Sequence, residues 1–471
     1  MDFIIYDIAF LVIFVLGTFL FLYRNRSNLK REGIMYLYRT NIGVKIIDTV
    51  SKDFAWLLRP LQYVIVASGY ILMGVVIYLI TKLAVPYLTS PTLARDLRVP
   101  VLLPLVPYVD RLFPSGLIPP FYFTYWIIII AAIAIPHEFA HGIFARFNKI
   151  KVKSTGFGFL GPFLAAFVEP DDKQMNKLKK FPQLTILAAG TFANVLFSII
   201  FALLLWAFFA LAFVPNGVQF NTYAATIVNV SSISAINGIA VNGLIDPSTI
   251  NGLQNISLIT VKSDGSTYYA TYSLLDNSFK NNLSAMFVYE DSPALRSNLT
   301  GAIVEFEGIK VTSLDQLKSL INANKPGDNI SIKSYSQTEN AYHDYQITLA
   351  EKDGKPFLGI GNLVSSRSGF SKFIASILAQ IRDPYVYYKS SLGNFGIFIY
   401  DLLWWLVLIN LSVAIFNMVP VGLFDGGRFF YLTIWGITKS KKSADWAFKI
   451  ITWIFLGVVA ALMIKWALVF L

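Results

Sequence analysis

Six long apolar segments dominate this chain of 471 residues, of which 55% are hydrophobic and only 14% are charged. Each segment is long enough to cross the roughly 30 Å hydrocarbon core of a bilayer as a helix. A helix satisfies its backbone hydrogen bonds internally, so it is a stable form for such a segment in lipid. The segments cover about residues 3–23, 61–85, 121–145, 183–213, 394–419 and 446–471. The sequence therefore predicts a mainly α-helical, multi-pass membrane protein.

The basic residues gather in alternate loops between these segments. Lys and Arg are frequent in 24–59, 146–180 and 439–449, whereas 86–120 holds few. Because basic loops stay on the cytosolic side, we expect these three loops to be cytosolic. Both termini and the long segment between the fourth and fifth spans would then lie outside a cell membrane. This distribution accounts for the net charge of +11, so we expect no nucleic-acid partner.

Residues 215–368 differ from the rest of the chain in having short alternating segments and frequent Gly, Asn, Asp and Ser, with a helical pattern at 314–321. We interpret them as an inserted soluble α+β domain. The pattern that begins at Ser292 resembles a PDZ domain, and a fainter version from Ser234 would be a second copy. PDZ domains bind an extended peptide, such as a protein tail, at a sheet edge. The alternative is a generic mixed fold that only spaces two halves of the membrane part.

A His-Glu-x-x-His pattern, formed by His137, Glu138 and His141, lies inside the third apolar segment. Residues four apart share one face of a helix, so both imidazoles can reach a single zinc ion with Glu138 beside them. The chain has only three histidines, and ionisable groups at membrane depth are costly unless they serve a site. We therefore favour zinc binding over two histidines that merely contact neighbouring helices.

A zinc ion that activates water needs a third protein ligand and an open fourth position. The chain has no cysteine, and His343 falls in the soluble segment, so carboxylates are the candidates. The acidic residues within 169–172 lie in a basic loop, where solvation or helix capping is their usual role. Asp425 follows the fifth apolar segment, which runs in the same direction as the third, and so reaches the same depth near the cytosolic side. We predict Asp425 as the third ligand; the alternative is that it caps a short helix beginning near Arg428.

Glycines and aromatic residues alternate around a Gly-Pro pair in residues 156–168. This pattern is typical of a hairpin, here one that dips into the membrane. Non-helical backbone at that depth is stable only where protein or a water-filled cavity satisfies it. Two interpretations stay open: the free strand edge accepts an unwound substrate, or the hairpin is a buried structural plug.

Together, these motifs resemble the site-2 protease family of intramembrane zinc metalloproteases. The likeness rests on the His-Glu-x-x-His pattern that begins at His137, and on an Asn-x-x-Pro-(x)4-Asp-Gly pattern that runs from Asn417 to Gly426. A PDZ-like insert between the two is a further shared feature. The spacing of Gly190 and Asn194 in the fourth span is similar to another family pattern, although Asn194 could instead form a hydrogen bond between helices.

The resemblance implies that His137, His141 and Asp425 hold one zinc ion per chain. It also implies that Glu138 is the general base and that Asn417 helps to hold substrate or to stabilise the site. Substrates of the family are transmembrane segments of other proteins, usually cut after a first cleavage removes a bulky exterior domain. The expected partners are therefore a transmembrane protein and the lipid bilayer, and the insert would act as a size filter or would read a peptide tail.

We expect an N-terminal extension of two spans at 1–120, two halves of a catalytic core at 121–214 and 369–471, and the PDZ-like domain, in one or two copies, at 215–368. Rival functions are a non-catalytic PDZ-bearing scaffold with structural zinc, a metal-ion transporter, and a membrane zinc protease with a glutamate ligand. The first two do not need a carboxylate beside the metal that is not itself a ligand, so Glu138 argues against both. The position of Asp425 argues against the third.

Overall fold

The computed structural model describes residues 3–33, 35–90, 105–112, 118–161, 163–241, 252–254, 256–280, 283–362 and 382–468. The chain divides into two compact units, which we call the membrane unit (residues 1–207 and 397–471) and the insert unit (residues 208–396). Each unit has hydrophobic clusters of its own. The insert unit extends beyond the 215–368 segment because the strands β5 (Phe213–Val218) and β20 (Val386–Ser390) pair with each other within it.

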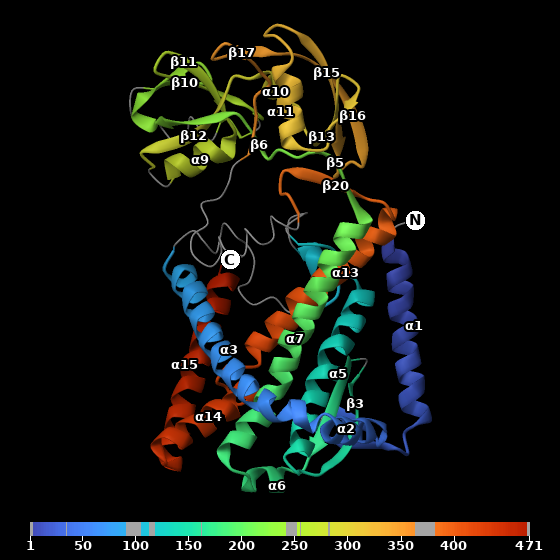
Figure 1. Ribbon diagram of the computed structural model, residues 1–471. Coiled ribbons are helices and arrows are strands. Elements are labelled where there is room, and N and C mark those ends of the chain that lie inside the picture. Colours follow the sequence, from blue (N-terminus) through green and yellow to red (C-terminus); the bar gives the residue numbers. More distant parts are fainter. Residues whose placement is uncertain are drawn as a thin grey trace. The chain divides into compact units, whose positions relative to one another are not determined.

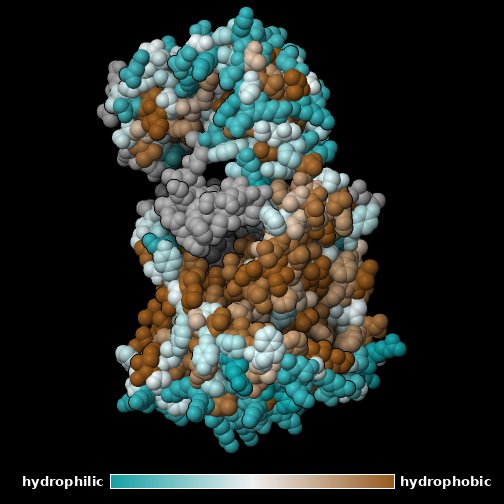
Figure 2. Space-filling view, in the orientation of Figure 1, coloured by the Kyte–Doolittle hydropathy of each residue, from teal (hydrophilic) through white to brown (hydrophobic). Residues whose placement is uncertain are grey.

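Among the described residues, six helices are long and apolar enough to cross a membrane. They are α1 (Phe3–Arg24), α3 (Ala55–Thr89), α5 (Phe123–Phe147), α7 (Lys180–Ala212), α13 (Gly393–Phe416) and α15 (Lys441–Ala467) (Figure 1). Each overlaps one predicted segment, so the six predicted apolar segments do form helices that are long enough to cross a membrane. Figure 2 shows a broad hydrophobic belt over these helices. The chain is thus a mainly helical protein that fits multi-pass insertion in a membrane.

A four-stranded antiparallel sheet packs against α5. Its strands, in spatial order, are β1 (Leu29–Glu32), β2 (Met35–Thr40), β3 (Val152–Leu160) and β4 (Phe163–Pro170). Strands β3 and β4 form the hairpin expected at 156–168; Pro162 in its turn lies outside the described residues. Strands β1 and β2 were not predicted, because their Lys, Arg and Glu residues suggested only a solvated basic loop. Among the described residues, no strand pairs with the second edge of β4.

The amphipathic helix α2 (Ile42–Asp53) and the sheet hold the second half of α5. A Cβ atom at Gly142 would lie 2.6 Å from Ile47 Cδ1 and 2.9 Å from Val168 Cγ1, so the glycine allows both neighbours to approach α5. The guanidinium of Arg146 in α5 donates to both carboxylate oxygens of Asp48 in α2. Packing and an ion pair therefore fix α5 in the region of the two histidines.

Asp7 of α1 is buried and caps the first turn of α5. Its carboxylate accepts hydrogen bonds from the N–H groups of Phe123, at 2.8 Å, and Thr124, at 2.9 Å, and from the Tyr108 hydroxyl, at 2.8 Å. The first N–H groups of a helix have no partner within the helix, and the N-cap residue of α5 forms no side-chain bond. The first span thus supplies the cap that α5 lacks.

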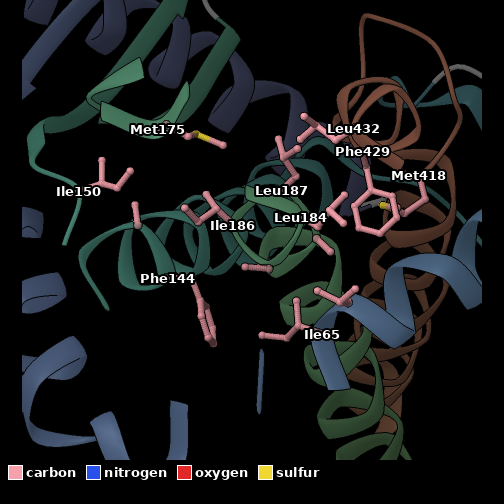
Figure 3. Packing of buried hydrophobic residues seen from close by; sticks show 14 of the residues in the cluster. Ile65, Phe144, Ile150, Met175, Leu184, Ile186, Leu187, Met418, Phe429 and Leu432 are labelled. Carbon is pink, nitrogen blue, oxygen red and sulfur yellow. The ribbon is translucent and has the colours of Figure 1, made fainter. Parts of the chain in front are cut away.

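The largest hydrophobic cluster of the membrane unit joins α3, α5, α7 and α14 (Asp425–Thr438). Figure 3 shows Ile65, Phe144, Leu187 and Phe429 from these four helices packed around one interior. A short helix, α6 (Asp172–Lys177), contributes Met175 to the same cluster. Because dense packing of this kind resists displacement, the cluster fixes α5, α7 and α14 relative to one another.

The insert unit contains two larger antiparallel sheets. The first has the order β7 (Ala225–Asn229), β12 (Ala285–Glu290), β11 (Ser266–Ala270), β10 (Ile259–Ser263), β8 (Ile233–Ile236), β9 (Ile239–Ala240), with the helix α9 (Tyr272–Lys280). The second has the order β16 (Ala341–Thr348), β15 (Asn329–Ser336), β13 (Ala302–Phe306), β5, β20, with β14 (Ile309–Lys310) and the helices α10 (Pro293–Arg296) and α11 (Leu314–Asn322). Two small pairs join β17 (Ala350–Lys352) to β18 (Lys355–Phe357) and β6 (Thr222–Tyr223) to β19 (Ile360–Gly361). Helix α11 lies where the pattern at 314–321 predicted it.

The same tight turn occurs in both sheets, and it also joins β10 to β11 and β17 to β18. Asn237-Gly238 joins β8 to β9, and Glu307-Gly308 joins β13 to β14, with positive φ at all four residues. In each sheet the first turn residue donates its N–H to a carbonyl of the adjacent strand, at 2.8 Å: Asn237 to Thr260 and Glu307 to Ser331. Two-residue turns of this kind match the twist of a hairpin. The shared turn lies at the positions where the sequence suggested two related copies.

Candidate metal centre

The two histidines of the third span lie together on α5. His137 and His141 are one helical turn apart, and only 10% and 13% of their side-chain surfaces are exposed. Their Nε2 atoms are 3.0 Å apart. The pattern predicted that both imidazoles reach one point, and this separation agrees with that prediction.

Asp425 reaches the same point from the far end of the chain. Its Oδ2 atom lies 3.3 Å from Nε2 of His137 and 3.3 Å from Nε2 of His141. Asp425 is the first residue of α14, which therefore begins three residues before the position near Arg428 that the sequence suggested. The N-cap of α14 is Phe424, which forms no side-chain bond. The carboxylate of Asp425 thus faces the imidazoles.

The spacing of these three ligand atoms suits a metal ion. Ligand atoms bound 2.0–2.1 Å from a tetrahedral zinc ion lie roughly 3.3 Å from one another. The observed separations are 3.0, 3.3 and 3.3 Å. Two imidazoles and one carboxylate form a ligand set with an open position, as in catalytic zinc sites. The group formed by His137, His141 and Asp425 could therefore bind a metal.

Contacts from α7 determine which nitrogen of His141 is free. Its Nδ1 lies 2.6 Å from the backbone carbonyl oxygen of Ile186. A carbonyl oxygen only accepts, so Nδ1 carries the proton and Nε2 keeps its lone pair for a metal. A backbone atom of the fourth span thus prepares His141 as a ligand.

Asn194, also on α7, contacts the other imidazole. Its side-chain amide nitrogen lies 3.1 Å from Nδ1 of His137, while its Oδ1 is buried and has no hydrogen-bond partner. Amide orientation is assigned from the surrounding hydrogen bonds, and a half turn exchanges the two atoms. The buried oxygen then accepts from Nδ1–H, which leaves Nε2 of His137 unprotonated. In this orientation, Oδ1 of Asn194 has a hydrogen-bond partner and Nε2 of His137 is free to bind a metal.

Helix α7 approaches the histidines at Gly190. A Cβ atom there would lie 2.6 Å from Nε2 of His137 and even closer to Nε2 of His141. Any side chain at this position would occupy the space between the imidazoles. Gly190 and Asn194 are one turn apart on α7, so the Gly-x-x-x-Asn spacing provides room and a hydrogen bond on one face. The sequence indicated this spacing only through a resemblance. The physical reason for the spacing depends on how α7 packs against α5.

The loop before Asp425 is closed by backbone contacts. The N–H of Gly426 donates to the carbonyl of Asn417 at 2.8 Å. A Cβ atom at Gly426 would lie 2.6 Å from the Cα of Met418, and Gly427 is equally crowded by loop backbone. The two glycines therefore allow residues 417–424 to fold over the start of α14. The structure places Asn417 in this loop through its backbone; within the described part of the chain, no hydrogen bond involves its side chain.

Glu138 contacts the hairpin. Its Oε2 accepts a hydrogen bond, at 3.1 Å, from the N–H of Val168 on β4. Because backbone groups alternate in direction along a strand, those of Ala166 and Leu164 point from the same edge. This edge is the one that faces away from β3. The predicted general base therefore lies at the end of a free strand edge.

The other ionisable candidates have separate partners. His343, on β16 of the insert unit, contacts Glu339 at 2.7 Å. Asp171 caps α6, as expected for this loop. Burial raises the pKa of Glu169, but hydrogen bonds from Ser154 and Arg39 lower it further, so its net pKa lies below the ordinary value. These contacts leave Asp425 as the carboxylate that joins the histidines.

Comparison with known proteins agrees with this centre. The family model described as Peptidase family M50 matches residues 125–462, which include all the residues that form the centre. The uncharacterized protein MJ0971 of Methanocaldococcus jannaschii is 28% identical over 197 residues, which is 40% of this chain and 48% of that protein. The chain thus spans about half the length of that curated relative. The family model covers well over half of the chain, and the chain belongs to peptidase family M50, the site-2 protease family.

Proposed function

We propose that this protein is a zinc metalloprotease that cuts transmembrane segments of other membrane proteins within the bilayer. The observation that carries the proposal is that Asp425 meets His137 and His141, which lie beside Glu138 on a helix long and apolar enough to span a membrane. A bound zinc ion polarises the carbonyl group that is attacked and lowers the pKa of water. Membership of family M50 supports both the metal and the peptide substrate.

In this proposal, each residue has a distinct task. His137, His141 and Asp425 hold the metal. Glu138 takes a proton from the attacking water and gives it to the leaving nitrogen, which is the work of a general base and then a general acid. The N–H of Val168 holds the Glu138 carboxylate in place.

We propose that the free edge of β4 holds the substrate chain in an extended form. The backbone groups of Leu164 and Ala166 on this edge have no partner strand among the described residues. Peptides commonly bind by adding a strand to such an edge. A chain paired there would lead directly to Glu138, which favours the substrate-binding interpretation of the hairpin over the structural plug.

We place the site near the cytosolic side, with both termini and the insert unit outside. His137 and His141 lie in the second half of α5, just before the basic loop that leads to α7. Basic loops stay in the cytosol. The same rule assigns the loops after α1 and α14 to that side.

We further propose that the insert unit consists of two PDZ-like copies that restrict access or bind the tail of a substrate already shortened by a first cut. The shared turns at Asn237-Gly238 and Glu307-Gly308 support two copies. A sheet edge in either copy offers the backbone groups that an extended peptide would pair with.

The decisive experiment compares the native chain with Glu138→Gln in proteoliposomes that contain a transmembrane peptide. We expect the variant to retain one zinc ion per chain but to cleave roughly 100- to 10,000-fold more slowly, because a general base typically contributes that much. Glu351→Gln, a change of the same kind at an exposed position of the insert unit, should cleave normally. A zinc-loaded Glu138→Gln chain that cleaves at the native rate would contradict the proposal, and a scaffold or transporter would show no cleavage in any variant.

A further inference from the structure

The membrane unit contains an apolar pocket between α1, α5 and the four-stranded sheet. Its volume is about 550 Å³, which lies within the range of pockets that hold organic ligands. Small residues open the space: Gly17 on α1, Ala131 and Ala134 on α5, and Ala166 on β4. None of the described residues that line it is charged.

Two walls of the pocket converge on Glu138. On α5, Ile127, Ala131 and Ala134 line the pocket at helical spacing, and Glu138 is the next residue of the same stripe. On β4, Leu164 and Ala166 line it at strand spacing, and the next residue of that face, Val168, donates to Glu138. The lining residues on both elements therefore end one step before the predicted general base and its hydrogen-bond partner Val168.

The third wall is α1, and it is held in place. Asp7 binds the first turn of α5, which ties this span to the catalytic helix. Ten residues later, Gly17 faces the pocket, where a Cβ atom would find no other atom within 4 Å. The N-terminal span thus completes a cavity that α5 and the hairpin leave open.

We propose that this pocket is a specificity site that binds large apolar side chains of the substrate next to the bond that is cut. The inference rests on the proposed function. Residues directly opposite each other on paired strands point to the same face of a sheet. Substrate residues paired with Leu164 and Ala166 therefore direct their side chains into the pocket. A lipid tail fits less well, because the lining that the structure describes includes no basic residue to hold a head group.

The first test measures occupancy without cleavage. The chain has no cysteine, so a single cysteine can be placed in the Glu138→Gln background. Ala131→Cys lies in the pocket, and the matched control Ile128→Cys lies on the same helix, where Ile128 is 38% exposed. The probe is a synthetic peptide with a core of about 20 leucine and alanine residues, an Asn-Gly break and one cysteine beside the break.

We expect an oxidant to couple this peptide to the Ala131→Cys chain far more than to the Ile128→Cys chain. Equal coupling of the peptide to the two chains would overturn the proposal that the pocket binds substrate side chains. Native mass spectrometry gives a second check. The proposal would also be contradicted if it found, in place of the peptide, a retained phospholipid that the Ala131→Cys change displaces. Because the chains used here are inactive, this result stands even if the native protein cuts nothing, in which case the proposed function alone fails.

The second test fills the pocket in the active chain. Gly17→Phe should raise KM roughly 10-fold or more for a peptide with leucine at the pocket position, since a single methylene group in an apolar pocket changes specificity about 10-fold or more. The rise in KM should be small for the same peptide with alanine at the pocket position. The amount of bound zinc should not change. Gly74→Phe on α3, where a Cβ atom also meets nothing within 4 Å, is the matched control. Equal kinetics for the two variants on the leucine peptide would overturn the proposal.

Discussion

The membrane unit and the insert unit use polar side chains in opposite ways. In the membrane unit, buried polar groups such as His137, Asn194 and Asp7 each meet a specific partner at a helix end or at the candidate metal centre. In the insert unit, the buried polar side chains include serines such as Ser263 and Ser292, and ion pairs such as that of Asp291 with Arg296 lie near the surface. Single changes should therefore act on the site in one unit and on stability in the other.

The two units can also be observed separately. All nine tryptophans belong to the membrane unit, so tryptophan fluorescence reports on that unit alone. Hydrogen exchange measured by mass spectrometry reports on individual strands of the insert unit.

The largest effect on zinc binding should follow Gly190→Ala. The added methyl group would occupy the space between the two imidazoles, so we expect zinc affinity to fall by roughly 100-fold, at the upper end of what neighbouring residues contribute to metal binding. Isothermal titration with zinc measures the change. Gly457→Ala on α15, where a Cβ atom meets nothing within 4 Å, should bind zinc as the native chain does. Native affinity in Gly190→Ala would show that α7 does not limit the centre.

The largest effect on stability should follow Phe306→Ala in the insert unit. Phe306 is 1% exposed in an apolar cluster, and the cavity left by such a truncation costs about 3–5 kcal/mol. We expect β13 and β15 to exchange hydrogen much faster, with zinc binding and tryptophan fluorescence unchanged. Ile309→Ala, at a position that is 48% exposed, is the control. Simultaneous loss of zinc would break the comparison, because the two units would then not be separately stable.

A smaller effect should follow Asp7→Ala. Loss of a capping carboxylate typically costs about 1 kcal/mol, so the first turn of α5 should exchange hydrogen several-fold faster. Asp53→Ala, at an exposed position in α2, provides the control. Unchanged exchange near Phe123 would mean that packing alone holds this end of the helix.

The smallest effect concerns pH. A hydrogen bond from Arg296 lowers the pKa of Asp291, with a nitrogen to oxygen distance of 2.6 Å. A depressed pKa stabilises the folded insert unit above the unfolded value of about 3.9, and this contribution is lost as the pH falls through the lower, folded value. For a pair so near the surface we expect about 0.5 kcal/mol. A double-mutant cycle of Asp291→Asn and Arg296→Gln at pH 6 and pH 3 measures it, and equal coupling at both values would exclude the ion pair.

Much of the fold was predictable from local pattern. The six spans follow from apolar length, and the hairpin at β3 and β4 follows from alternating glycine and aromatic residues. The pairing of β1 and β2 with that hairpin was not predicted, because nothing in a charged loop indicates which strand it will pair with. Likewise, Asp7 is one polar residue in an apolar run, and its role as a cap depends on α5 lying beside it.

By itself, the sequence determined how many spans the chain has, which histidines share a helical face, and that a carboxylate follows the fifth span. These properties depend on spacing and on apolar content over one helix length. Only the tertiary structure decided that Asp425 meets both imidazoles, that α7 leaves room at Gly190, and that Ile186 and Asn194 orient the rings. The physical reason is that contacts between distant segments depend on how whole helices pack, and no local pattern encodes that packing.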